Sequence, residues 1–259
     1  MELGLVGKQA IVCASSRGLG RACAEALAGE GVAVTINGRD TVVLEKAAEE
    51  IRAATGASVL PVAADIDTPE GREALLEACP DADILVNNNW GPPPKDFADT
   101  TYDEWMKVIN ANMLAPLMMI QALLPGMRER GFGRIVNITS QMVKAPRPHM
   151  ALSAGARTGL TAACKAISRD CVKDNVTINT LLPERVDTHR QAYMAERRAE
   201  MAGISIAEAR AEQKASIAAG RLGKPEEFGA ACAFLCGVNA GYISGQNIQL
   251  DGGSFPGLI

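Results

Sequence analysis

Apolar residues in this chain form short, nearly continuous runs that alternate with longer amphipathic stretches. The runs that we predict to be strands are Gln9–Ala14, Val32–Ile36, Val59–Val62, Ile84–Asn87, Arg134–Thr139, Val176–Leu182 and Asn247–Asp251. Helical periodicity lies between them, for example in Arg21–Ala28, Leu44–Ala54 and Pro69–Ala78. Strands with little polar alternation are typical of a sheet covered on both faces. The pattern therefore predicts an α/β fold, a doubly wound parallel sheet of the Rossmann type, as a single domain over residues 1–259.

The segment 187–220 departs from this rhythm. It is long, charged and helical in pattern, and it contains no predicted strand. An insertion after a strand's carboxyl end lies on the side of the sheet where doubly wound folds bind their ligands. We predict a helical lid over a substrate cleft.

Composition and charge exclude several classes of function. The 259 residues carry a formal net charge of −4, which gives no basic surface for nucleic acid. We find no apolar run long enough to cross a bilayer and no signal-peptide pattern, so a cytoplasmic protein without membrane contact is expected. The cysteines lie mostly in apolar patterns, with no cysteine–histidine cluster, so core packing is expected and no metal site.

A glycine-containing turn follows the first predicted strand and opens a helix. Its residues are Ser16, Arg17, Gly18, Leu19 and Gly20. Such a turn brings free backbone N–H groups of the helix N-terminus close to a phosphate. We therefore predict a dinucleotide site there, although two glycines at a turn also occur for steric reasons alone.

The end of the second strand bears on the choice of cofactor. The stretch Asn37-Gly38-Arg39-Asp40 has no acid at its start to accept a bond from a ribose 2′-hydroxyl. Arg17 and Arg39 instead favour the 2′-phosphate of NADP(H) over NAD(H), because guanidinium groups bind phosphate strongly. The alternative is that both arginines are solvated surface charges.

From Leu3 to Gly253 the chain resembles the short-chain dehydrogenase/reductase family, in the 3-oxoacyl-acyl-carrier-protein reductase branch. It is most similar to a divergent subgroup with altered glycine-loop and catalytic residues. The matching landmarks include the loop Ser16–Gly20, Asp65, Asn87-Asn88, Asn112, Ile138-Thr139-Ser140, Leu182-Pro183 before Thr188, and Asp251-Gly252-Gly253. The resemblance implies that the cofactor contacts come from Ser16, Arg17, Gly18, Leu19, Gly20, Asn37, Arg39, Asp65, Ile66, Asn88, Arg157 and Thr188.

The same resemblance implies a catalytic set in which two members are replaced. Ser140 stands at the position of the family's serine and Asn112 at that of its asparagine. Ser153 occupies the position of the catalytic tyrosine, and Arg157 that of the lysine one helical turn later. A serine hydroxyl is too short and too weakly acidic to replace the phenol, and a guanidinium keeps a positive charge without acting as an acid.

Three further departures surround this set. Ala14 replaces the first loop glycine, Asn89-Trp90 replaces an alanine–glycine pair, and Glu184 replaces the glycine after Pro183. The Trp90 indole must turn toward the substrate cleft or cover the cofactor. The Glu184 carboxylate is either a catalytic group or an obstacle.

The chain has only two histidines, His149 and His189, and both map to loops around the expected cleft. Histidine is the usual group for proton transfer near neutral pH. We expect His149 to reach the space beside Ser140 and to be the proton donor, with His189 as the second candidate; loop placement by chance is the competing interpretation.

The stretches 102–128 and 152–171 resemble the family's dimer-forming helices, with a kink expected at Pro116. A homodimer or homotetramer acting on a small-molecule carbonyl or alcohol is therefore expected. Three functions remain open: an NADP(H)-dependent reductase of a ketone or oxoacyl group with a non-standard proton donor, a catalytically silent nucleotide-binding subunit that pairs with an active paralogue, or a non-redox lyase or dehydratase using the same cleft.

Overall fold

A computed structural model describes residues 2–258 of the chain. Seven parallel strands form one sheet in the order β3-β2-β1-β4-β5-β6-β7. The strands are β1 Gln9–Val12, β2 Ala33–Gly38, β3 Val59–Ala63, β4 Ile84–Asn87, β5 Gly133–Ile138, β6 Val176–Pro183 and β7 Asn247–Leu250. The seven predicted strands and the doubly wound parallel sheet are thus confirmed. The chain reverses direction across the sheet between β1 and β4, where such folds open their ligand crevice.

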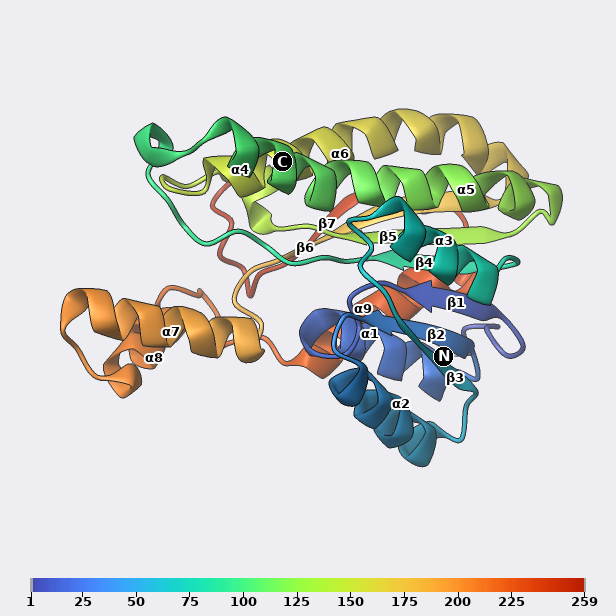
Figure 1. Cartoon of the computed structure of the whole chain (residues 1–259), viewed down its shortest axis with the longest axis horizontal. Helices are drawn as coiled ribbons and strands as arrows, with labels where there is room; N and C mark the ends of the chain where they lie inside the picture. The colour runs from blue at the N-terminus through green and yellow to red at the C-terminus, as the bar shows by residue number, and fades with distance from the viewer. Residues whose placement is uncertain (1, 259) are drawn as a thin grey trace.

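Helices cover both faces of the sheet (Figure 1). One face packs against α1 Gly18–Gly29, α2 Thr41–Thr55 and α9 Pro225–Cys236, and the other against α3 Pro69–Ala78, α5 Ala115–Glu129 and α6 Ala151–Cys171. Helix α4 Tyr102–Ile109 packs beside α6. A Cβ at Gly229 would lie 2.4 Å from the carbonyl oxygen of Ala22, so α1 and α9 can approach this closely only with glycine there.

All seven cysteines are free and buried, in agreement with the predicted core packing. Burial raises the pKa of the Cys13 thiol to about 12, so this group is no nucleophile at neutral pH.

The predicted fourth helix is interrupted. Between α4 and α5 the segment Asn110–Leu114 forms one turn of π-helix. Pro116 follows directly and has no N–H to donate to the carbonyl of residue 112, so the regular α-helical ladder cannot continue there. The irregularity expected from Pro116 is therefore a π turn, and it places Asn112 within that turn.

The helical run Tyr102–Glu129 has a mean hydropathy of 1.4 in its most apolar window, so by length and composition it could cross a bilayer. The sequence-based expectation of no such run was therefore too strong. In the fold, Met119, Leu123 and Met127 of this run are buried against the sheet, as in a core helix.

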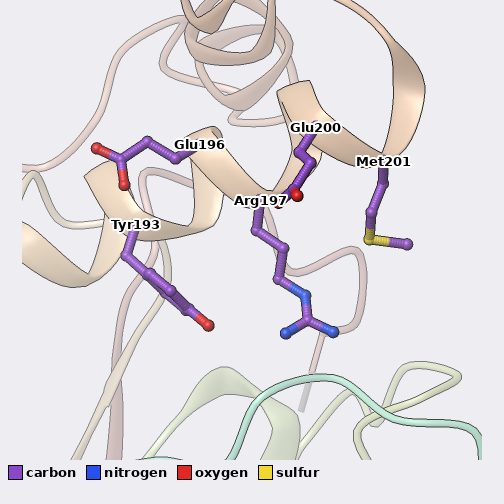
Figure 2. A pocket seen from close by; sticks show the side chains of 5 residues that line it. All are labelled: Tyr193, Glu196, Arg197, Glu200 and Met201. Carbon is purple, nitrogen blue, oxygen red and sulfur yellow. The ribbon is translucent and has the colours of Figure 1, made fainter.

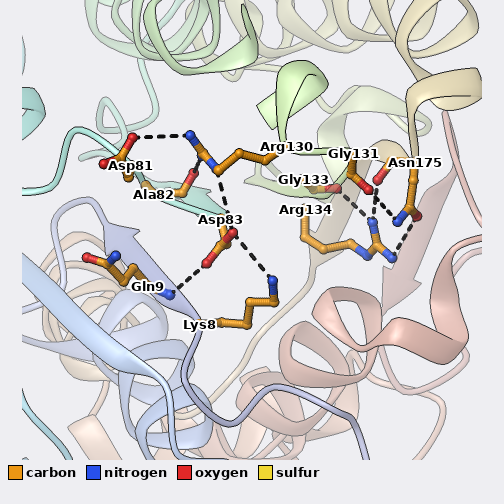
Figure 3. A network of polar contacts seen from close by, with 10 residues as sticks. All are labelled: Lys8, Gln9, Asp81, Ala82, Asp83, Arg130, Gly131, Gly133, Arg134 and Asn175. Atoms are coloured by element: carbon orange, nitrogen blue, oxygen red, sulfur yellow. Dashed lines mark hydrogen bonds and ion pairs between the residues drawn. The ribbon is translucent and has the colours of Figure 1, made fainter. Parts of the chain in front are cut away.

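At the amino ends of the strands, charged groups form a compact network (Figure 3). Arg134 on β5 is 1% exposed, and its guanidinium donates to the carbonyls of Gly133 and Asn175 at 2.8 Å. It also stacks on Phe132, 4.4 Å from the ring centroid. Nearby, Asp83 lies between Lys8 and Arg130, 3.6 and 3.9 Å from their nitrogens.

The predicted lid consists of two helices, α7 His189–Ala202 and α8 Ile206–Ala215, which stand beside the main body in Figure 1. They pack on each other through Ala195, Ala199 and Ala209. Ser205 caps α8 in a capping box with Glu208, which fixes the turn between the helices.

Candidate active site

A cleft of about 680 Å³ lies at the carboxyl ends of the central strands, beneath the start of α7. The predicted site residues that line it are Arg17, Gly18, Leu19, Arg39, Asn88, Ser140, Ser153, Arg157 and Thr188. They come from the segments that follow β1, β2, β4, β5 and β6, and from α6. The structure thus brings most of the proposed cofactor and catalytic positions into one space.

One end of the cleft fits a pyrophosphate. Arg17 is the N-cap of α1, makes no side-chain capping bond, and is followed by no acid in the first turn. The N–H groups of this turn are therefore available to an anion. A Cβ at Gly20 would lie 2.5 Å from the Ala14 carbonyl oxygen, so glycine is needed for the helix to start this close to β1.

The end of β2 fits a 2′-phosphate. Arg39 is 67% exposed, with its nearest guanidinium nitrogen 4.0 Å from the Asp65 carboxylate. The neighbouring acid, Asp40, accepts a bond from Val43 N and caps α2, so it is not directed at a ribose. The N-terminus of α7 lies beside the glycine loop. A Cβ at Gly18 would be 3.8 Å from Thr188, the N-cap of α7.

Several predicted cofactor residues support the site from below. Asn37 is 1% exposed, and its side chain accepts from Ala14 N and donates to the carbonyls of Val62 and Ala64. It therefore holds the β1–α1 turn against β3, and its side chain does not line the cleft. Ser16, Gly20, Asp65 and Ile66 also do not line the cleft.

Trp90 turns away from the cofactor loop. Its indole N–H donates to Asp67 Oδ2 at 3.0 Å, and its ring packs with Val108 and Leu152. Asn89 donates to the other Asp67 oxygen at 2.7 Å. The two residues that replace the family's small pair thus bind Asp67, and the indole forms part of the cleft wall.

Ser140, Ser153 and Arg157 all line this cleft. Ser140 accepts a bond from Met142 N, which leaves its hydroxyl hydrogen available. Arg157 is 8% exposed and donates from one terminal nitrogen to the carbonyls of Ile138 and Thr139, both at 3.0 Å. Its burial, together with the charge of Arg190, lowers the pKa of Arg157 to about 10.

Asn112 lies behind this group, in the π turn, and does not line the cleft. Its amide nitrogen donates to Val108 O at 3.4 Å. Its Oδ1 is buried and bonds to no donor within residues 2–258. Asn112 thus presents a buried acceptor that has no donor in the described part of the chain.

His149 does not reach Ser140, so our expectation for its placement was wrong. Its side chain is 57% exposed, its Nδ1 lies 2.5 Å from Asp96, and it is absent from the cleft lining. The left-handed backbone at this residue, with φ of 65°, accompanies this outward position. His189, at the start of α7, does line the cleft.

Glu184 is buried in the cleft wall between two arginines. Its Oε1 lies 3.1 Å from Arg147 and 3.5 Å from Arg185. Arg147 also donates to Gln141 at 3.2 Å. These two ion pairs hold the Glu184 side chain in the cleft wall.

With this geometry in place, comparison with known proteins decides the family. The family model described as enoyl-(acyl carrier protein) reductase matches residues 13–254. The chain belongs to the short-chain dehydrogenase/reductase family.

Individual members are similar over nearly the whole chain. The 3-oxoacyl-acyl-carrier-protein reductase FabG of Vibrio cholerae is 31% identical, over 98% of this chain and 99% of its own length. An uncharacterized oxidoreductase of Bacillus subtilis, YvaG, is 31% identical over 98% of both. L-Sorbose reductase of Gluconobacter frateurii, solved with NADPH and L-sorbose, is 28% identical and matches the whole of both chains with a TM-score of 0.95.

The substrate end of this short-chain dehydrogenase/reductase contains side chains that the sequence interpretation did not assign. Arg147, Arg185, Arg190 and Tyr193 all line the cleft. Arg190 donates to the Pro92 carbonyl at 2.9 Å, and its guanidinium lies 5.7 Å from the Tyr193 ring. A sequence signal existed, since these residues follow the fifth and sixth strands, where ligand-binding loops are expected.

The cleft continues outward along the lid. A second hollow of about 340 Å³ is lined by Tyr193, Glu196, Arg197, Glu200 and Met201 of α7. Tyr193 and Arg197 extend from the same side of the helix in Figure 2, and Tyr193 lines both spaces. Helix α7 therefore borders both hollows through Tyr193.

Proposed function

We propose that the protein is an NADP(H)-dependent oxidoreductase that reduces a ketone or oxoacyl-type carbonyl, or oxidises the corresponding alcohol. The observation that carries this proposal is the convergence of an uncapped α1 N-terminus, Arg17 and Arg39 with Ser140 in one cleft. It is supported by relatives named as reductases and by the NADPH complex of the sorbose reductase.

The nicotinamide group, when bound, would supply or accept the hydride. The first turn of α1 and Thr188 would hold the cofactor's pyrophosphate and carboxamide, while Arg17 and Arg39 would bind the 2′-phosphate. Ser140 would donate a hydrogen bond to the substrate oxygen. Arg157 would supply positive charge as that oxygen becomes negative, because a preorganised cation in a buried site stabilises developing charge.

The proton would come from the lid helix. His189 and Tyr193 line the cleft, and neither is in an ion pair within the described part of the chain. Glu184 is paired with two arginines, and Arg157 is not an acid. Removal of the donor should lower turnover by about a hundredfold.

The first experiment is a titration of the purified protein with NADPH and NADH, followed by assays of NADPH oxidation with a panel of ketones. Tighter binding of NADPH together with ketone-dependent oxidation is expected. Binding without turnover would favour the silent-subunit function, and turnover with no change in the cofactor would favour a lyase.

A second set of variants locates the proton donor. His189→Gln and Tyr193→Phe should be compared with His149→Gln, whose side chain is turned outward beside Asp96. One of the two lid variants should lose turnover with NADPH binding retained, and the His149 variant should keep it. A loss confined to His149→Gln would contradict a donor on the lid.

The assembly that we propose is a homodimer or homotetramer in the cytoplasm. Tyr102, Met106, Leu114 and Met118 are exposed apolar side chains at helical spacing along α4 and α5. On the neighbouring α6, Gly155 lies against Trp105 and Gly159 against Met113, which brings the two helices together. A dimer would cover this surface, and light scattering of Met106→Glu would test it.

A further inference from the structure

The cleft has a pronounced excess of positive charge although the whole chain has a net charge of −4. Six arginines and a single carboxylate, Glu184, line it. The arginines are Arg17, Arg39, Arg147, Arg157, Arg185 and Arg190. A cleft lined by one sign of charge concentrates ligands of the opposite sign.

The cofactor phosphates and Glu184 account for four of these cations; Arg157, which the family resemblance also places at the cofactor, is not at the phosphate end. Arg17 and Arg39 lie at the end assigned to the phosphates, while Arg147 and Arg185 pair with Glu184. Arg157 and Arg190 remain. Within residues 2–258, neither has a carboxylate within ion-pair distance, and their side-chain bonds are to main-chain carbonyls only.

Arg157 has donor capacity left over. One terminal nitrogen makes both of its bonds, and the buried Nε has no partner in the described chain. The other terminal nitrogen faces Gly91, where a Cβ would lie 3.5 Å away. A buried guanidinium with unused donors is costly unless a ligand completes it.

Ser153 contributes space and a hydroxyl beside this cation. It precedes Arg157 by one helical turn on α6 and lines the same cleft. A serine at the family's tyrosine position occupies less of the cleft than the aromatic ring would, and it borders the cleft volume directly. Ser140 borders that volume from the end of β5 with a second hydroxyl.

We propose that Arg157 and Ser153, beside Ser140, form a binding site for a carboxylate group of the substrate, which makes the substrate a keto acid or hydroxy acid. The proposal rests on the proposed reductase function, and it adds that the substrate carries a carboxylate near the reacting carbonyl. The second terminal nitrogen of Arg157 would donate to the carboxylate, and the Ser153 hydroxyl would supply a further donor. The exchange of tyrosine and lysine for serine and arginine thus replaces an acid–base pair by an anion-binding pair.

Electrostatics point the same way. The pKa of Arg157 is depressed by burial and by Arg190, so the unliganded site holds a cation that its surroundings disfavour. A carboxylate placed there would relieve both effects. Arg190, at the start of α7, lines the same cleft and adds a second positive charge to it.

The test compares matched substrates that differ only in this charge. Small 2-oxo and 3-oxo acids should be assayed with NADPH against their neutral amides. Because a charge-assisted bond contributes about 1.5 to 3 kcal/mol, kcat/KM for the acids should exceed that for the amides by about tenfold to a hundredfold.

Three variants assign this preference to the site. Arg157→Lys keeps the charge but loses the planar fork, and Ser153→Ala removes one donor; both should reduce the acid-to-amide ratio, with NADPH affinity retained. Arg169→Lys, at the exposed far end of the same helix, is the matched control and should keep the full ratio. If Arg157→Lys does not fold, Ser153→Ala still gives the answer.

Binding separates failure of this site from failure of the reductase function. Oxalate titrated into the protein–NADPH complex should bind, and binding should weaken in Arg157→Lys and Ser153→Ala. Oxalate binding without oxidation of NADPH by any substrate would overturn the reductase function and leave the site intact. Equal turnover of acids and amides, or a change in NADPH affinity alone in Arg157→Lys, would overturn the carboxylate site.

Discussion

Two buried arginines lie at opposite ends of the same strand, and their surroundings differ. At the amino end of β5, all three guanidinium nitrogens of Arg134 donate to oxygens of Gly133, Asn175 or Gly237, and the group stacks on Phe132. At the carboxyl end, Arg157 bonds to Ile138 and Thr139 but keeps a buried Nε without a partner.

The backbone shows the same difference. Ala14, His149 and Arg185, which have positive φ, lie on segments around the cleft, and only Ala14 stands at a family glycine position. At the amino end, the residue with positive φ is Asn175, a type that tolerates this conformation. Strain and unsatisfied donors together are typical of a functional site, whereas complete bonding is typical of a structural one.

The largest expected effect of a single substitution is on the stability of Arg134→Met. Arg134→Met would leave the carbonyls of Gly133, Asn175 and Gly237 without their donor. Each carbonyl left without its donor should cost about 1 kcal/mol or more, so the free energy of unfolding should fall by about 3 kcal/mol. Denaturant titration measures this, with Arg130→Met as control. Arg130 is partly exposed and its closer ion pair is with the exposed Asp81, so its loss should be smaller. Equal losses of stability in the two variants would contradict the structural role of Arg134.

At the carboxyl end, Arg39→Asp should change ligand choice without changing the fold. Loss of a charge-assisted bond to the 2′-phosphate, and repulsion from the new acid, should weaken NADPH by about tenfold to a hundredfold relative to NADH. Calorimetry with both nucleotides gives the ratio, and the melting temperature of the free protein should be nearly unchanged. An unaltered ratio would mean that Arg39 is a solvated surface charge.

The smallest expected effects concern the two left-handed residues. Ala14→Gly removes steric strain at φ of 45° but loosens the unfolded chain, so stability should change by no more than about 1 kcal/mol, upward. Asn175→Gly should lower stability, because the Asn175 side chain bonds to Gly131 and Arg134. Thermal unfolding of both variants tests this. Stability changes of the same sign in the two variants would contradict the difference between the two ends of the sheet.

The sequence predicted the sheet well because buried parallel strands leave continuous apolar runs. It also located Ser140, Ser153 and Arg157 in one cleft, since these positions follow strand ends or share a helix face. It failed for His149, whose direction depends on Asp96, and it did not predict that Asn37 bonds to the carbonyls of Val62 and Ala64 or that Trp90 bonds to Asp67. These partners lie on other segments, and periodicity does not report which loop side chains meet.

The sequence did not predict the excess of positive charge in the cleft, for a related reason. Arg147, Arg185 and Arg190 are spread over three segments, and only folding brings them together around Glu184 and Arg157. Net charge counted along the chain hides such a concentration.

The most direct measurement is the free energy of unfolding of Arg157→Met relative to the unmodified protein, without ligands and with NADPH plus oxalate. Without ligands the variant should lose less than about 1 kcal/mol, because removing a buried cation next to Arg190 offsets the lost bonds to Ile138 and Thr139. With ligands, the unmodified protein should be stabilised more than the variant. A loss near 3 kcal/mol in the free protein, as expected for Arg134→Met, with equal stabilisation by the ligands, would show that Arg157 is structural and would contradict the account.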